Sequence, residues 1–182
     1  FAAYNSSDTE NDNIAIGYNA MTTNTAGGTY NIALGNYALD ALTSGDYNVA
    51  IGYASLGANT TGGENTAVGG YALLTNVTGE ANVGIGYASL RTNVASSNTA
   101  MGYESMRLNT SGANNTAIGR AALYTNTTGA ENVSVGKNSL LANTTGSNNV
   151  AIGVEAMDAN TTGATNVGIG KSALGSNTTG TR

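Results

Sequence analysis

The sequence contains no cysteine, proline, histidine or tryptophan, and only 9% of its 182 residues are charged. Without cysteine there are no disulfide staples, and without histidine no Cys–His or Ser–His–Asp nucleophilic site can be built within this chain. No run of about 18 apolar residues is present, so we expect no membrane span. What remains is a chain rich in Asn, Thr, Ser and Gly, with a composition unlike that of an ordinary globular domain.

Basic residues are absent from the first half of the chain. Residues 1–90 hold seven acidic residues and no Lys or Arg, whereas residues 91–182 hold four acidic and all six basic residues. We interpret this difference as variation among solvated positions rather than as a device for end-to-end docking. Because half of the chain has no cation to neutralise phosphate, we expect no nucleic-acid partner.

One unit of 17 residues repeats ten times between Asn13 and Arg182. It reads N-[VIT]-A-[IVLM]-G-x-x-[AS]-[LM]-x-x-N-T-T-G-x-x, and its positions are numbered 1 to 17 below. The units begin at residues 13, 31, 48, 65, 82, 98, 115, 132, 149 and 166. A fixed period of this kind predicts a repeat architecture over residues 13–182. Residues 1–12 lack the unit, and we expect them to lead in from a preceding segment of a longer protein.

Two positions of the unit are apolar in every copy. Position 4 is Ile, Leu, Val or Met, and position 9 is Leu or Met, so both are predicted to be core rows. Positions 2 and 4 share one face of an extended strand. Position 3 is always Ala, Gly or Ser, which suggests that another backbone or subunit passes close to it. Position 6 alternates between Tyr and Arg, Lys or Asn, so we predict that it faces solvent.

Glycine and asparagine mark the corners of the unit. Gly occupies position 5 in all ten units, as a corner with positive φ or a close backbone approach requires. Asn occupies position 1 in ten units and position 12 in nine, with Leu42 as the exception. Amide side chains stacked at a fixed period can bond from coil to coil, and we expect that of these asparagines.

Two short strands and two corners in 17 residues predict one coil of a parallel β-solenoid. The fold class is therefore all-β, a β-roll of ten coils, because two helices would need about 30 residues or more per repeat. A coil of this size encloses only one or two rows of side chains, and no polar cap is visible at either end of the array. We therefore expect a homotrimer with a common axis.

The strand motif resembles two groups of fibrous proteins. NVAIG or NTAIG followed by a small residue and Leu, as at Asn48–Gly52, Asn115–Gly119 and Asn149–Gly153, looks like the head repeats of trimeric autotransporter adhesins. The longer stretch NTAIGRAALYTNTTG (Asn115–Gly129) is closer to repeats of phage tail-fibre proteins, which often end in an endosialidase-type chaperone domain. The first resemblance implies a left-handed trimeric β-roll. Neither resemblance supplies a binding residue.

No constellation of residues predicts catalysis, a metal or a cofactor, so we expect no enzyme and name no catalytic, cofactor-binding or metal-binding residue. Carboxylates do not pair at a recurring offset; the closest pair within the repeats, Glu155 and Asp158, is interpreted as a solvated loop pair. Two surface rows remain as alternatives. Thr pairs at positions 13 and 14 would stack into a ladder that could bind ice or glycans, although we favour a plain turn. The second row consists of the Asn-x-Ser/Thr acceptors at position 12, and we expect them to be bare: Asn59, Asn76, Asn109, Asn126, Asn143, Asn160 and Asn177.

These observations predict a structural role. We expect a shaft or head segment of an extracellular or virion fibre that holds a receptor-binding tip at a distance. A cell-surface glycan or receptor would then be bound through other parts of the protein. The alternative is a binding module, an adhesin or a glycan-binding or ice-binding β-roll that uses its Thr ladder.

Overall fold

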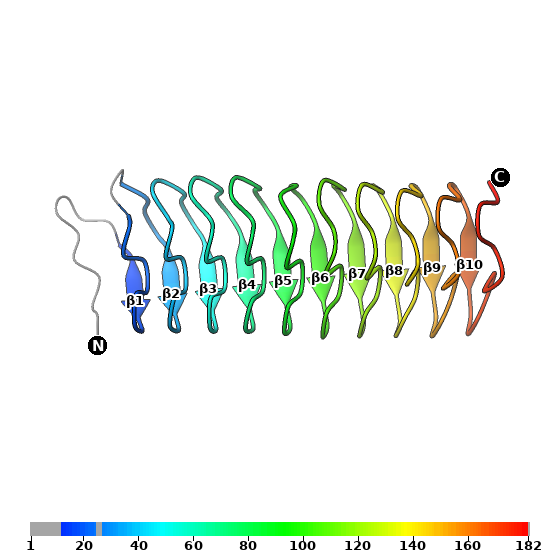
Figure 1. Ribbon diagram of the computed structural model, residues 1–182, viewed down its shortest axis with the longest axis horizontal. Helices are drawn as coiled ribbons and strands as arrows, with labels where there is room; N and C mark the ends of the chain where they lie inside the picture. The colour runs from blue at the N-terminus through cyan, green and yellow to red at the C-terminus, as the bar shows by residue number, and fades with distance from the viewer. Residues whose placement is uncertain (1–11, 25–26, 182) are drawn as a thin grey trace.

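A computed structural model describes residues 12–24 and 27–181, and it consists of a single stack of coils with one strand in each (Figure 1). The strands are β1 (Ile14–Ile16), β2 (Ile32–Leu34), β3 (Val49–Ile51), β4 (Thr66–Val68), β5 (Val83–Ile85), β6 (Thr99–Met101), β7 (Thr116–Ile118), β8 (Val133–Val135), β9 (Val150–Ile152) and β10 (Val167–Ile169). They form one ten-stranded parallel sheet in sequence order. The predicted all-β parallel solenoid with about 17 residues per coil is confirmed. Residues 1–11 of the expected lead-in lie outside the described residues.

The register of the sheet follows the repeat. Each strand pairs with the next at equivalent positions, as in Val49↔Thr66, so residues of the same type stack along the rod. The longer step between units 13 and 31 keeps this register, since Ile14 pairs with Ile32. The shorter step at Val83↔Thr99 keeps it as well. Length differences are therefore absorbed outside the strands.

The interior of the coil differs from the sequence prediction. Position 9 is a core row as predicted, with Leu or Met fully buried in nine units. Position 4 is not, because its side chains lie half-buried or exposed on the outer face of the sheet, as with Ile118 at 39% exposure. The strand residue that points inward is position 3, for example Ala117, which is fully buried. Position 3 is small because it faces the Leu column inside the coil, and no second backbone or subunit is needed to explain it.

The contact between positions 3 and 9 shows how little room the interior has. A Cβ atom added to Gly84 would lie 3.3 Å from Cγ of Leu73 in the preceding coil. One added to Gly168 would lie 2.8 Å from Cγ of Met157. Each large side chain is thus covered by the small strand residue of the next coil. Leu174, which has no further coil of described residues stacked on it, is 47% exposed.

The second strand that the sequence predicted in each coil is absent from the described residues. Positions 7 and 9 instead adopt left-handed φ values, as at Ala121 (φ 52°) and Leu123 (φ 53°). Because every second residue of this segment is left-handed, the segment is not an extended strand. Backbone hydrogen bonds between coils are still made, for example from the Leu123 N–H to the Ser139 carbonyl at 2.9 Å. Position 17 is left-handed as well, for example Glu131 (φ 59°). Sequence reasoning missed these positions because non-glycine residues seldom adopt this conformation.

The two reasons proposed for Gly at position 5, a positive φ and a close backbone approach, are both confirmed. Its φ lies between 119° and 145° in every coil, a region closed to residues with a side chain. A Cβ on Gly119 would also lie 2.7 Å from the carbonyl carbon of Gly136 in the next coil. The strand therefore ends at a corner that only glycine can form.

Replacing a left-handed alanine by glycine should leave the coil at least as stable. Ala121→Gly removes the cost of a left-handed L-residue, about 1–2 kcal/mol, and loses about 0.4–1 kcal/mol through greater freedom of the unfolded chain. We expect the free energy of unfolding to stay equal or rise, as measured by urea denaturation. Ala130 at position 16 has no positive φ, so Ala130→Gly is the matched control and should destabilise. Equal losses in both variants would contradict the conformation described here.

Candidate functional site

Two rows of buried asparagine amides run along the rod. At position 1, Asn132 donates its backbone N–H to Oδ1 of Asn115 at 2.9 Å, and its Nδ2 to the same atom at 3.1 Å. Its Nδ2 also donates to the Gly146 carbonyl at 2.9 Å, within the same coil. At position 12, Asn143 Nδ2 donates to Asn126 Oδ1 and to Gly146, both at 2.9 Å. The coil-to-coil amide bonds expected from the sequence are therefore confirmed, and the asparagines serve the interior rather than a ligand.

The position 12 row is interrupted in the middle of the rod. Asn93 lies in the 16-residue unit, and its Nδ2 donates to the Ala95 carbonyl at 2.7 Å. Oδ1 of Asn76 is consequently buried without a hydrogen-bond partner among the described atoms. The row resumes where Asn109 Nδ2 donates to Asn93 Oδ1 at 2.6 Å. The shortened corner therefore breaks the amide row at a single step.

The same burial bears on the glycosylation motifs at position 12. Six of the seven acceptor asparagines at this position have fully buried side chains, and Asn177 is partly buried. Their amides already donate to a neighbouring coil or to the glycine carbonyl of their own turn, as Asn160 does to Asn143 and Gly163. A glycan cannot be accommodated at these six amides in the folded coil.

The threonine row has a structural use. The hydroxyl of Thr127 at position 13 donates to the Thr144 carbonyl at 3.0 Å, and that of Thr144 donates to the Thr161 carbonyl at 3.0 Å. These hydroxyls satisfy backbone acceptors of the next coil. Position 14, such as Thr128 and Thr145, is exposed, so only half of each Thr pair is free of this role.

The outer face of the sheet is aliphatic. Positions 2 and 4 of every strand project outward, and their side chains are Ile, Val, Leu, Met or Thr. The exposed members are Ile14, Ile16, Leu34, Met101, Ile118, Ile152, Val167 and Ile169. We call these two rows the outer sheet face; they follow the rod over about 43 Å, nine strand spacings of ~4.8 Å.

Tyrosines form a row along one edge next to this face. Position 6 is exposed, as predicted, but the row also draws on position 7, so that side chains from both positions alternate. Successive rings lie 5.3–5.8 Å apart between centroids, edge to face at first and stacked in the last pair. The row consists of Tyr18, Tyr37, Tyr53, Tyr71, Tyr87 and Tyr103. Tyr37 and Tyr71 occupy position 7, directly after position 6, and both have left-handed φ values. Their place next to position 6 was the signal in the sequence that they could join the row.

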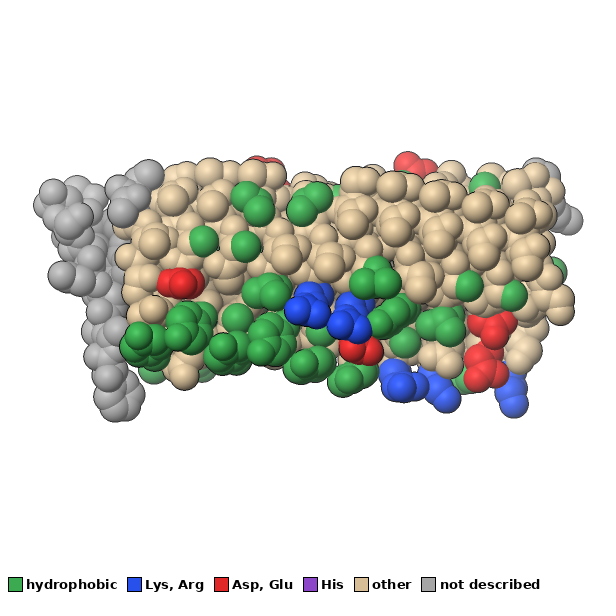
Figure 2. Space-filling model, viewed as in Figure 1, with side chains coloured by type: hydrophobic (Ala, Val, Ile, Leu, Met, Phe, Trp, Pro, Cys, Tyr) green, Lys and Arg blue, Asp and Glu red, His purple; other side chains and the backbone are tan. Residues whose placement is uncertain are grey.

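All the basic residues in the described part of the chain continue this edge. The guanidinium carbon Cζ of Arg91 lies over the ring of Tyr71, 5.8 Å from the ring centroid. Arg107 donates to the Tyr124 hydroxyl at 2.7 Å and pairs with Glu104 at 3.2 Å. The bond to Tyr124 raises the pKa of the Arg107 guanidinium above its ordinary value. The other bases, at position 6, are Arg120, Lys137 and Lys171. In Figure 2, hydrophobic side chains gather along the lower edge in the N-terminal half, with basic and acidic side chains beyond them.

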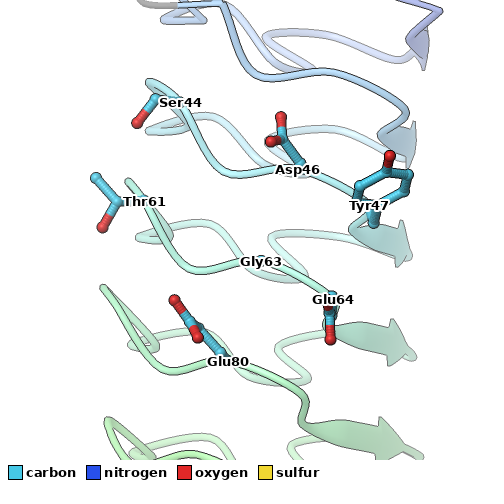
Figure 3. A pocket seen from close by; sticks show the side chains of 7 residues that line it. All are labelled: Ser44, Asp46, Tyr47, Thr61, Gly63, Glu64 and Glu80. Atoms are coloured by element: carbon cyan, nitrogen blue, oxygen red, sulfur yellow. The ribbon is translucent and has the colours of Figure 1, made fainter.

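The opposite edge, at positions 14 to 17, holds an acidic recess of about 240 Å³ (Figure 3). Asp46, Glu64 and Glu80 line it from three successive coils, together with Ser44, Tyr47, Thr61 and Gly63. Asp46 already accepts bonds from the backbone N–H and the hydroxyl of Thr29, at 2.7 and 3.0 Å. The recess is open to solvent, and the hydrogen bonds of Asp46 join two neighbouring coils at this corner. We therefore assign the recess a structural role and no reaction.

Two features are absent from the described part of the coil, a metal site and a membrane-spanning helix. Within residues 12–24 and 27–181, no group of three His, Cys, Asp or Glu side chains is placed to hold a metal ion. The same residues include no helix that is long and apolar enough to cross a membrane. Glu155 and Asp158 do not join any such group.

Comparison with known proteins gives no further assignment. No protein-family model, no curated protein and no solved structure matches the chain. The surfaces of the coil are therefore the basis for any statement about its function.

Losing one amide donor from the buried row should destabilise the rod. In Asn126→Asp the side chain keeps its shape but loses the Nδ2 donor to Asn109 and Gly129, both within 2.8 Å. We expect a loss of about 2–3 kcal/mol, because a buried carboxylate faces acceptors. Asn114→Asp is the control, since Asn114 is exposed at position 17 and Asp tolerates its positive φ. Thermal unfolding followed by circular dichroism measures both; equal melting temperatures would contradict the role of the row.

Proposed function

We propose that this chain is a structural rod segment of an extracellular or virion fibre, which spaces or presents a receptor-binding tip. The observation that supports this most is the uninterrupted stack of coils, in which every described strand pairs in the same register. The most uniform positions of the unit are those that build the coil: Gly at the corner, Asn in the amide rows and Leu or Met in the interior. Because the constant residues of the unit all stabilise the stacking of coils, the unit is suited to a rod that acts as a spacer.

We also propose that the rod is a homotrimer. The outer sheet face supplies the surface for this, because aliphatic side chains on two positions of each strand are left half-buried or exposed. Exposed apolar patches of a few hundred Å² or more mark interaction sites in soluble proteins. Three copies with their sheets turned to a common axis would cover this face along the whole rod, and closed symmetry would leave no face open. The resemblance to trimeric adhesin heads agrees with three copies.

Charges placed on the outer sheet face should dissociate the assembly without unfolding the coil. In Ile118→Lys/Ile152→Lys two outward side chains of β7 and β9 become cations that would meet their copies near the axis. Sedimentation equilibrium should change from three copies to one, with unchanged circular dichroism. Thr128→Lys, at the exposed position 14, is the control and should remain trimeric. A folded monomer for the unsubstituted chain would overturn the proposed trimer.

The rod itself is tested by changing its length. Deletion of residues 115–148 removes two whole units and rejoins coils in register, so we expect a folded rod about 10 Å shorter. Small-angle X-ray scattering measures the maximum dimension. Deletion of residues 115–122 removes about half a unit, misaligns the amide rows and should prevent folding of the coils that follow. If both deletions fold equally well, length is not set by whole units and the spacer role fails.

A further inference from the structure

We propose that the edge built from the tyrosine row and the basic residues binds a linear acidic polysaccharide along the rod. We call it the aromatic–basic edge, and it consists of positions 6, 7 and 10 of the coils. This inference goes beyond the spacer role, because the rod itself would contact a glycan. It uses an edge other than the outer sheet face, so its test does not depend on the copy number.

The first support is the exposure of the aromatic rings. Tyr18 is 60% exposed and Tyr87 and Tyr103 are each nearly half exposed, so the parts of their rings that the neighbouring ring does not cover are available to a ligand. A pyranose ring has an apolar face of C–H groups that packs on an aromatic face, while the tyrosine hydroxyl can bond to sugar hydroxyls. Tyrosine gives this contact at a low cost in side-chain entropy. Beside Tyr18, an open recess of about 270 Å³ is lined by Ile16, Gly17 and Asn36.

The second support is the repeat of the edge. Rings follow one another at 5.3–5.8 Å over six coils, so the edge offers a straight, periodic series of contacts rather than one pocket. Contact between neighbouring rings holds each one in place before a ligand arrives, which lowers the entropy lost on binding. A ligand that fits such a series is itself extended and periodic, as a linear polysaccharide is.

The third support is the distribution of charge. The protein carries a net charge of −5, yet every described basic residue lies on this edge. Asp46, Glu64 and Glu80 lie on the opposite edge, whereas Asp40, Glu104, Glu155 and Asp158 share positions 7 and 10 with the bases. Arg107 is held by Glu104 and Tyr124, whereas Arg120, Lys137 and Lys171 are exposed. Guanidinium and ammonium groups bind carboxylates in charge-assisted hydrogen bonds, and in the described part of the chain only this edge offers such groups to an anionic ligand.

A single-stranded nucleic acid would also use aromatic rings and cations, but the arrangement favours a sugar. Nucleic acid brings one phosphate with every nucleotide, and its affinity depends on neutralising them. The tyrosines from Tyr18 to Tyr71 lie in the half of the chain that has no Lys or Arg. A polysaccharide can stack on these rings through uncharged faces and place its carboxylates beside Arg120 and Lys137.

The test measures binding of the whole chain to immobilised polygalacturonate by biolayer interferometry, with neutral pullulan and oligo(dT) as comparisons. We expect saturable binding to polygalacturonate and weaker binding to the other two. Tyr87→Ala/Tyr103→Ala should weaken it at least about fivefold, since aromatic anchors carry much of the binding energy. Arg120→Gln/Lys137→Gln should also weaken it and should reduce its dependence on salt.

Matched controls lie on the opposite edge. Tyr30 and Tyr47 form an equivalent exposed stacked pair, with ring centroids 5.0 Å apart, so Tyr30→Ala/Tyr47→Ala should bind as the unsubstituted chain does. Tyr87→Phe/Tyr103→Phe keeps the rings and should retain most of the affinity. No binding to polygalacturonate, or binding to pullulan or oligo(dT) of equal strength, would overturn the proposal. A changed copy number in Tyr87→Ala/Tyr103→Ala would overturn it too, because the edge would then be a contact between copies.

Discussion

The hydrogen bond that the asparagine of each coil donates to the asparagine of the preceding coil is the interaction on which the rest of the structure depends. A coil of 17 residues has too few residues to satisfy its corner backbone groups by itself, and buried backbone groups left unpaired are costly. The position 1 amide solves this by accepting from the backbone of the next coil and donating to the carbonyl of its own turn, as Asn115 does toward Asn132 and Gly129. The same bond fixes the spacing and register of the coils. A change of period must therefore occur in the corner, where the 16-residue unit breaks the second amide row at Asn76.

Filling the interior with amides and one column of Leu or Met leaves little volume for anything else. Position 3 must be Ala, Gly or Ser, and position 8 is Ala or Ser for the same reason. The larger β-branched residues of the strand then have only the outside to occupy. An apolar outer sheet face is thus a consequence of a narrow interior, and the proposed trimer is the arrangement that covers it. In this sense the coil and the proposed assembly follow from one constraint on volume.

Residue types vary most at the edges of the coil, where packing of the interior does not restrict them. Positions 6, 7, 10, 16 and 17 vary from unit to unit, yet their chemistry is sorted in space. All the described bases and six of the tyrosines gather on one edge, together with four acids, whereas the other edge has an acidic recess, with Asp46 and Glu64 in adjacent coils, and no described base. The bases also stay in the C-terminal half of the rod, because the coils follow one another in sequence order. That sorting supports the proposed glycan contact, and it could not be read along the chain because each edge takes one or two residues from every unit.

The sequence by itself determined the period, the parallel β-solenoid, the glycine corner, the amide rows and the Leu or Met column, because each depends on a residue type that recurs at one position. Only the tertiary structure decided which face of the strand is inside. Side chains alternate along a strand, so positions 2 and 4 must lie opposite position 3, but either face can be turned inward. Hydrophobicity favoured Ile118 over Ala117 as the buried residue, whereas position 3 packs on the Leu or Met column of the preceding coil, as Gly84 does on Leu73, and admits only a small residue. The left-handed backbone at Leu123 and Ala121 was likewise decided by packing, since closing so short a coil around that column outweighs the local preference of those residues.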